Sequence, residues 1–255
     1  MAPDIAPELQ LTGERTLPGI PQENYWFQRH LVAYEYAMRF ARGARVIDVG
    51  CGEGYGPAML ARDAESVLGI DVAPEVVRHA LSRYHAENLS FEVMDVNALS
   101  AADGGFDLAV SFQVVEHLVD VSGYFAEMAR VLAKKGVAVL TTPNRLTISP
   151  GRDEPINPFH LREYTPGEFR SVLEPHFAEI EIIGLFHTGW LSVNERLKVV
   201  DFIKVYEMGR LNPRRWTHRL LTPLLSTREF RFGSEGLERC LDMVAVCRRP
   251  GGGAL

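Results

Sequence analysis

A short glycine-rich stretch, Val46–Gly56, carries the strongest chemical signal in the sequence. Gly50 and Gly52 flank Cys51, at the end of a β-rich apolar run that contains the acid Asp48. Glycines at a turn from a strand into a helix let the backbone approach a ligand closely, and the helix N-terminus offers unpaired N–H groups. A nicotinamide dinucleotide loop would have a third glycine where this chain has a tyrosine. The stretch therefore predicts a ligand-binding loop of another class.

Two further acids stand at the ends of the next two β-rich runs. Asp71 lies about twenty residues past the loop, where a carboxylate can accept both hydroxyls of a ribose. Asp95 ends the third run and is followed by Val96. Such acids can also simply cap helices. Because three strand ends each carry an acid in register, the pattern favours one nucleoside-containing ligand bound along the same rim.

A parallel sheet is needed to bring these strand ends together. Helical segments alternate with five β-rich runs, at 44–50, 66–71, 89–95, 106–112 and 137–142. This alternation predicts βαβ crossovers. Two more strands are expected at 178–186 and 241–249, the last as an antiparallel edge strand. The sequence therefore predicts an α/β fold with a doubly wound, Rossmann-like sheet of seven strands.

Two segments flank this predicted domain of residues 43–255. Residues 1–42 are expected to form an extended arm followed by a helix from Asn24 to Phe40. Residues from about 187 to 235 break the strand rhythm and predict an insertion that covers the rim of the sheet. The insertion carries arginines typical of a solvated face or of a mouth for an anionic or polyhydroxyl ligand: Arg210, Arg214, Arg215, Arg219, Arg228 and Arg231.

The D-x-G-x-G pattern at residues 48–52 resembles the first motif of class I methyltransferases, and the likeness covers about residues 43–183. The resemblance implies S-adenosyl-L-methionine as the cofactor. It further implies that the loop holds the methionine part, that the second strand end holds the ribose and the third the adenine, and that the fourth strand ends beside the cofactor. The cofactor-binding residues expected on this basis are Asp48, Gly50, Cys51, Gly52, Asp71, Val72, Asp95, Val96, Phe112 and Gln113.

Glu116 and His117 follow the fourth strand, and His160 follows the fifth, on the rim that faces the substrate. His117 is the first candidate for the general base of a methyl transfer to a hydroxyl, with a capping role as the alternative. The three residues together resemble the E-x-x-E-H plus distal histidine arrangement of metal-dependent methyltransferases, which implies a possible divalent metal such as Mg²⁺. Gln113 replaces the first glutamate of that arrangement, so the sequence favours a free base over a metal.

The expected N-terminal helix is dense in aromatic and polar residues near its start. Tyr25, Trp26 and Arg29 could close the cofactor pocket as a lid. The alternative is that this helix only packs on the sheet.

A longer series of segments, TGERTLPG, ENYWFQRH, GCGEGYG, FQVVEHL and the stretch from Thr142 to Glu163, resembles one bacterial subgroup associated with methylglucose lipopolysaccharide synthesis. This resemblance implies O-methylation of a sugar, with a small-molecule or oligosaccharide acceptor. Methylation of an RNA 3′-terminal sugar or of a catechol-like quinone precursor is the alternative within the class. A non-catalytic cofactor-binding module is the alternative from another class.

The length, net charge, hydropathy and cysteine content limit the classes of partner and the compartment that we expect. The chain has 255 residues and a net charge of −6, and an acidic surface is a poor general binder of nucleic acid, so no nucleic-acid partner is expected. Its apolar runs are too short to span a bilayer, and its start lacks a basic, apolar leader. Three cysteines make no disulfide framework, which favours a reducing, cytoplasmic compartment.

Overall fold

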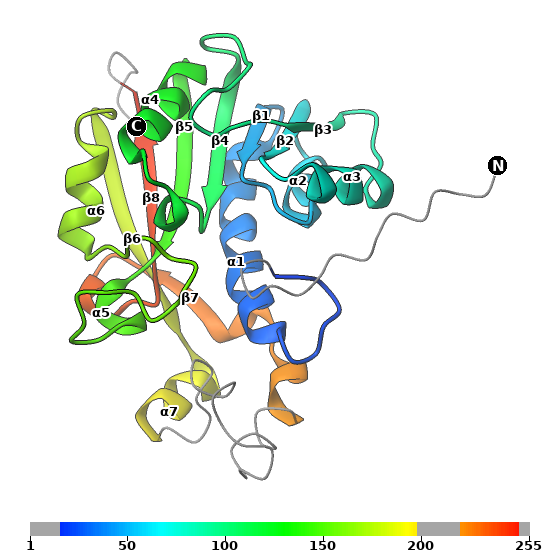
Figure 1. The fold of residues 1–255 in the computed structure, drawn as a ribbon. Helices are drawn as coiled ribbons and strands as arrows, with labels where there is room; N and C mark the ends of the chain where they lie inside the picture. Colours follow the sequence, from blue (N-terminus) through cyan, green and yellow to red (C-terminus); the bar gives the residue numbers. More distant parts are fainter. Residues whose placement is uncertain (1–15, 198–219, 250–255) are drawn as a thin grey trace.

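The structure is a computed structural model that describes residues 16–197 and 220–249. One mixed sheet forms its centre, with strands in the order β3-β2-β1-β4-β5-β8-β6-β7 (Figure 1). The strands are β1 (Arg45–Val49), β2 (Ser66–Asp71), β3 (Leu89–Val93), β4 (Phe106–Phe112), β5 (Leu132–Pro143), β6 (Glu179–His187), β7 (Phe230–Gly233) and β8 (Asp242–Arg248).

Seven helices of the described residues accompany the sheet: α1 (Asn24–Ala41), α2 (Tyr55–Leu60), α3 (Pro74–Arg83), α4 (Val121–Val131), α5 (Arg145–Ile148), α6 (Pro166–Leu173) and α7 (Gly189–Leu197). Short 3₁₀ turns are η1 (Val115–His117), η3 (Thr222–Leu224), η4 (Thr227–Glu229) and η5 (Leu237–Arg239). Where the chain is described, no helix is long and apolar enough to cross a membrane.

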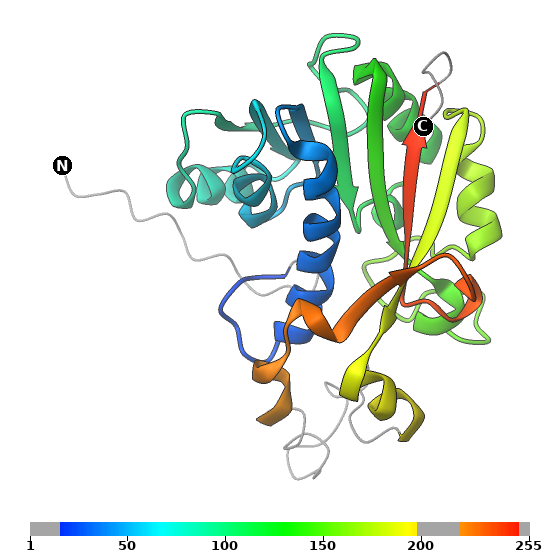
Figure 2. The ribbon, with the colours of Figure 1, turned by 180° about the vertical axis from the view of Figure 1, so that it is seen from behind.

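The sheet is covered on both faces because its central strands alternate between two apolar clusters. In β4, Leu108 and Val110 face a cluster built with α1, whereas Ala109 faces a cluster built with α4 and α6. Figures 1 and 2 show α1 crossing one face, with α4 and α6 against the other. The doubly wound, Rossmann-like prediction is therefore confirmed.

The sheet differs from the prediction in two ways, both beyond β5. Among the described residues it has eight strands rather than the predicted seven, because the four-residue β7 lies within the predicted insertion and is too short to show a period. The last strand, β8, is antiparallel as expected but lies between β5 and β6 instead of at an edge. Its run from Met243 to Cys247 is wholly buried, as expected of a central strand.

The parallel strands bring the predicted site together. β1 pairs with β2 on one side and with β4 on the other, so the strand order reverses between β1 and β4. A ligand crevice forms at such a reversal, outside the carboxyl ends of the strands. α1 runs beside this point, and its N-terminal half lies at the same rim (Figure 2).

Candidate active site

A cavity of about 350 Å³ opens at this reversal of strand order. Its walls come from the loop after β1, the ends of β2, β3 and β4, the turn η1 and one side of α1. The lining residues are Thr16, His30, Tyr34, Gly50, Cys51, Gly52, Glu53, Tyr55, Asp71, Val72, Asp95, Val96, Phe112, Gln113, Val114, His117 and Leu118. Of the ten residues expected at the cofactor from the sequence, all but Asp48 line it.

The glycine loop has a shape that other residues would resist. Gly50 and Gly52 both have positive φ, 82° and 54°. The N–H groups of Gly50 and Cys51 both donate to the carbonyl of Ile70, at 2.9 and 2.8 Å. A Cβ on Gly50 would lie 2.5 Å from a methyl of Val114. The loop therefore folds tightly over the end of β2, and its backbone forms one wall of the cavity.

Asp71 ties the same loop to the next helix. Its Oδ2 accepts the N–H of Gly52 at 3.2 Å, and its Oδ1 accepts the N–H of Ala73 at 2.9 Å. Asp71 therefore bonds the backbone of Ala73, the N-cap residue of α3, rather than being the cap itself, and it also lines the cavity. An ionised carboxylate has about four lone-pair sites, so these two bonds leave acceptor capacity for a ligand.

Asp48 lies beneath the loop and does not line the cavity. It is fully buried, and its Oδ2 accepts the Tyr34 hydroxyl at 2.9 Å. Its Oδ1 has no hydrogen-bond partner within the described part of the chain. Burial raises the pKa of Asp48 to about 7, against the lowering effect of the Tyr34 bond. Its contacts make it a support of the loop from below.

Glu53 is a loop residue that sequence analysis missed. Its carboxylate is almost completely buried and accepts the Tyr84 hydroxyl at 2.6 Å. His79 and Arg83 lie 3.1 and 3.0 Å from its Oε1. The glycine loop is therefore clamped to α3 by one charged side chain. An acid between two loop glycines was the available signal, because a charge there must find partners.

The end of β3 forms the far wall of the cavity. Asp95 is exposed, and its Oδ1 accepts the N–H of Asn97 at 2.9 Å. Val96 is buried behind it, whereas Val72, beyond β2, is exposed at the mouth. Phe112 packs edge-on against Tyr34, with ring centroids 4.6 Å apart. These positions give the cavity one polar exposed end and one aromatic end.

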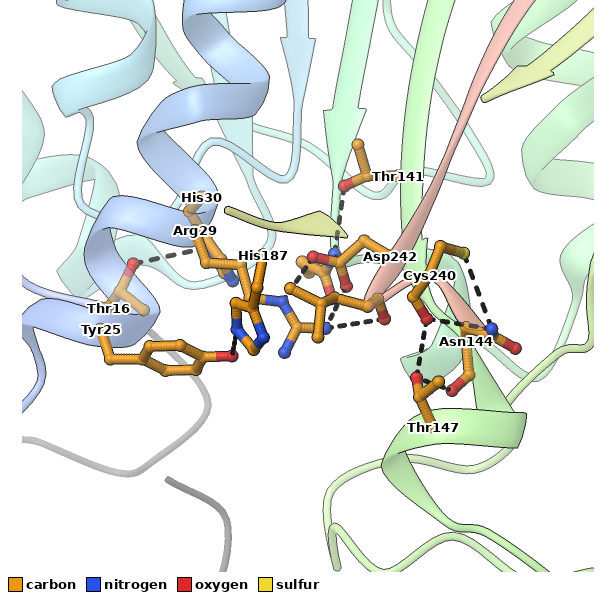
Figure 3. Close-up of polar contacts among 12 residues, drawn as sticks. Thr16, Tyr25, Arg29, His30, Thr141, Asn144, Thr147, His187, Cys240 and Asp242 are labelled. Carbon is orange, nitrogen blue, oxygen red and sulfur yellow. Dashed lines mark hydrogen bonds and ion pairs between the residues drawn. The ribbon is translucent and has the colours of Figure 1, made fainter. Parts of the chain in front are cut away.

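The three residues of α1 predicted as a lid lie away from the cavity. Tyr25, Trp26 and Arg29 are not among the cavity's lining residues: Arg29 is buried against Asp242, and the Tyr25 hydroxyl lies 2.9 Å from Nε2 of His187. Figure 3 shows these two contacts on the inner side of α1.

His30 and Tyr34, farther along the same helix, line the cavity instead. Burial lowers the pKa of His30 to about 4, so this wall is neutral at pH 7. A helical pattern cannot show which of its faces meets a loop and which meets a strand. For that reason the sequence did not distinguish these residues from their neighbours.

Glu116, His117 and His160 do come together, with one ligand atom of each within 4.8 Å of the others. Of the three, only His117 lines the cavity. Its Nδ1 lies 2.9 Å from the carbonyl oxygen of Phe159. Since a carbonyl oxygen only accepts, this bond puts a proton on Nδ1, and the neutral ring then has its lone pair on Nε2.

The other two residues lie behind His117. Glu116 is fully buried and accepts the Thr142 hydroxyl at 3.1 Å, and burial raises its pKa to about 8. The two ring nitrogens of His160 are both bonded, to Asn157 at 2.9 Å and to Glu163 at 2.8 Å. His160 therefore holds the segment 157–163, which carries Phe159.

These contacts fit a divalent metal only in part. The buried Glu116 Oε1 lacks a hydrogen-bond partner among the described residues, which a cation could supply. However, His160 would have to give up the Asn157 amide to become a ligand. The Gln113 amide nitrogen donates to Thr141 and Asp242 at 3.2 and 3.3 Å. These bonds direct it toward β5 and β8 and not toward His117 or His160. We therefore derive no catalytic step through a metal.

Comparisons with known proteins identify the family. A model described as a methyltransferase domain matches residues 47–140. A probable S-adenosylmethionine-dependent methyltransferase of Mycolicibacterium smegmatis is 37% identical over 95% of this chain and 96% of its own length. The chain belongs to the S-adenosylmethionine-dependent methyltransferases.

Two further likenesses of the methyltransferase are more limited. A ubiquinone biosynthesis O-methyltransferase of Methylocella silvestris is 32% identical over 43% of the chain and 44% of its own length. A crystal structure of an S-adenosylmethionine-dependent methyltransferase from Archaeoglobus fulgidus covers 89% of the chain and 97% of its own, with a TM-score of 0.61 and 16% identity. The second likeness concerns the fold alone. The full-length likeness to the relative from Mycolicibacterium smegmatis confirms the enzyme class and the cofactor predicted from the sequence.

Proposed function

We propose that the methyltransferase transfers a methyl group to a hydroxyl of a sugar acceptor, with His117 as the general base. The observation that carries this proposal is the hydrogen bond from His117 Nδ1 to the Phe159 carbonyl, at the wall of the cavity. It fixes the tautomer in which Nε2 accepts a proton. A base in this state suits an alcohol acceptor, whose proton must leave as its oxygen attacks.

In this proposal, successive walls of the cavity hold successive parts of S-adenosylmethionine. The glycine loop, with Gly50, Cys51 and Gly52, would take the methionine end, and Asp71 the ribose hydroxyls. Asp95 and the backbone of Val96 would take the adenine, as the family resemblance implies. The bound cofactor supplies an electrophilic methyl on a sulfonium, so the protein needs to provide alignment and proton transfer rather than a nucleophile of its own.

In the proposed step, the acceptor oxygen attacks the methyl carbon while His117 Nε2 takes the hydroxyl proton. The S-adenosylmethionine held by the glycine loop and Asp71 would supply the methyl group, keep the carbon–sulfur electron pair on its sulfur, and be released as S-adenosylhomocysteine. His117 keeps its orientation because its Nδ1–H goes on donating a hydrogen bond to the Phe159 carbonyl. His160 and Glu163 act by holding the Phe159 segment, and Glu116 forms the buried support beneath.

The sugar acceptor rests on the resemblance to the methylglucose polysaccharide subgroup. The net charge of −6 makes RNA a poorer candidate acceptor, because an acidic protein repels a polyanion. A catechol-like acceptor has the support of the likeness to a ubiquinone O-methyltransferase, but that likeness covers less than half of the chain.

A transfer assay with three acceptors tests the proposal. The protein, in buffer with a chelator, is incubated with methyl-labelled S-adenosylmethionine and a short glucan, a short RNA or a catechol. We expect label in the glucan alone, and loss of that label in His117→Gln. Label in the RNA or the catechol, or none in the glucan, contradicts the proposed acceptor.

A further inference from the structure

A buried ion pair joins the first helix to the last strand beside the candidate site. Arg29 of α1 and Asp242 at the start of β8 have side chains that are 5% and 3% exposed. Arg29 also donates to the carbonyl of Leu241 at 2.9 Å. Figure 3 shows the two side chains meeting between α1 and the start of β8. Buried pairs are weak sources of stability, because desolvation offsets their attraction, so stability alone is a poor reason for this one.

The pair extends to the rim of the cavity through Gln113. The Gln113 amide nitrogen donates to Asp242 Oδ1 at 3.3 Å and to Thr141 Oγ1 at 3.2 Å. An amide nitrogen has two hydrogens, so these bonds use both. The backbone N–H of Gln113 also donates to the Thr141 carbonyl, at 3.1 Å. The residue is therefore held from both its side chain and its backbone.

Gln113 needs such support because its backbone is strained. Its φ is 58°, and in the part of the chain that the structure describes it is the one residue other than glycine with positive φ. This conformation is unfavourable for a residue with a Cβ and persists only where surrounding contacts enforce it. The two amide bonds supply that enforcement.

The direction that Gln113 gives to the chain decides where the reaction centre lies. Val114, which follows it, packs against Gly50 so closely that a Cβ on Gly50 would clash. The N–H of His117 then donates to the Val114 carbonyl at 3.0 Å, which closes the turn η1. A change at Gln113 would therefore move both the glycine loop and His117.

We propose that Gln113 and Asp242 are positioning residues, which direct η1 so that His117 stands at the cavity wall. Arg29 fixes Asp242, Asp242 and Thr141 fix the Gln113 amide, and the left-handed turn at Gln113 aims the segment that carries His117. The inference rests on the proposed function only in taking His117 as the base. Its test therefore needs no acceptor.

The test is the ring nitrogen spectrum of His117 by long-range ¹H–¹⁵N NMR, in the protein saturated with S-adenosylhomocysteine. The His117 signals are assigned by their loss in His117→Gln. In the unmodified protein we expect one tautomer with the proton on Nδ1, as the Phe159 bond requires. In Gln113→Met, which keeps the length but loses both amide bonds, we expect shifted signals from mixed tautomers.

Two more variants separate conformation from simple loss of contacts. Gln113→Gly also lacks the amide, but adopts positive φ at no steric cost, so it should restore most of the single-tautomer pattern. Thr141→Val removes one acceptor of the amide and should shift the signals partly. Asp107→Asn is the control. It breaks the exposed Arg45–Asp107 pair at the amino-terminal ends of β1 and β4, away from the cavity, and should leave the His117 signals unchanged.

An unchanged His117 spectrum in Gln113→Met and Thr141→Val would overturn the inference. A Gln113→Gly spectrum as displaced as that of Gln113→Met would overturn it as well, because the backbone conformation would then not be what matters. Should Gln113→Met fail to fold, the Thr141→Val spectrum decides. A failure to methylate the glucan leaves these spectra untouched, so the two proposals fail separately.

Discussion

His117 and Phe159, 42 residues apart in the chain, are joined by a 2.9 Å hydrogen bond from a ring nitrogen to a backbone carbonyl. The bond links the turn after β4 to the segment after β5, across the rim of the sheet. It selects one tautomer of the imidazole at the wall of the cavity, where we propose that the acceptor meets the cofactor. The chemistry assigned to this methyltransferase depends on that link.

Replacing His117 by alanine should lower kcat by about 10²–10⁴-fold, the usual contribution of a general base, with little change in cofactor affinity. Transfer of labelled methyl to the glucan measures it. His85→Ala, which removes an exposed histidine, is the control and should retain the normal rate. A near-normal rate in His117→Ala would leave alignment alone as the source of catalysis.

Chelation should leave the rate unchanged, because Gln113 and His160 are engaged by Asp242 and Asn157 rather than available to a cation. The measurement compares the transfer rate before and after exhaustive treatment with EDTA. Loss of activity that Mg²⁺, Mn²⁺ or Zn²⁺ restores would replace the free base with a metal mechanism.

Asp71→Ala should weaken binding of S-adenosylhomocysteine by about 1–3 kcal/mol, because the ribose hydroxyls would lose a charged acceptor. Calorimetric titration measures the affinity, and the melting temperature reports the loss of the Gly52 and Ala73 bonds separately. Asp63→Ala removes an exposed acid that does not line the cavity and serves as the control. Unchanged affinity would mean that Asp71 only ties the glycine loop to the start of α3.

Glu116→Gln tests the buried carboxyl through the pH dependence of stability. Burial raises the pKa of Glu116 from 4.5 to about 8, so between these values the unfolded chain loses a proton that the folded protein keeps. The free energy of unfolding should therefore fall as pH rises through this window, and level off above it. Glutamine does not titrate and should escape this loss.

The stability of Glu116→Gln relative to the unmodified protein should thus grow by roughly 2–5 kcal/mol between pH 4.5 and 8. Urea unfolding at a series of pH values, with EDTA present, gives the difference. Glu174→Gln, at an exposed site, should show no such growth. A constant difference across the window would mean that Glu116 is ionised in the fold.

The sequence predicted strands β1 to β5 well because they are mostly apolar runs with polar residues at one end. It also placed Asp71, Asp95 and His117 at one rim, since parallel strands share their carboxyl edge. The central position of β8 was missed, although its unbroken apolar run pointed to burial on both faces. Pairing of that strand with β6 is a long-range choice that no local pattern contains.

Side-chain partners distant in the sequence were the other limit. Nothing near Arg29 indicates Asp242, and nothing near Glu53 indicates Tyr84 at the C-terminal end of α3. Four of the predicted insertion's arginines, Arg210, Arg214, Arg215 and Arg219, lie outside the described residues. Of the other two, Arg231 stacks over the ring of Phe186, 5.1 Å from its centroid, and Arg228 is exposed.

The insertion still stands as the proposed determinant of acceptor choice. Because β7 belongs to the sheet, an exchange should stop before Phe230. Replacing residues 188–229 by the matching segment of a related methyltransferase should change the ratio of rates on different acceptors and leave S-adenosylhomocysteine affinity near normal. An unchanged ratio would place acceptor choice elsewhere on the rim.

An experimental structure with bound S-adenosylhomocysteine tests the central assignment most directly, through the position of the ligand in the electron density. We expect the ribose hydroxyls on the Asp71 carboxylate, the adenine between Asp95 and Val96, and the sulfur on the side of the cavity where His117 stands. Density for the ligand outside this cavity, or inside it with the ribose away from Asp71 and the sulfur away from His117, would contradict the account.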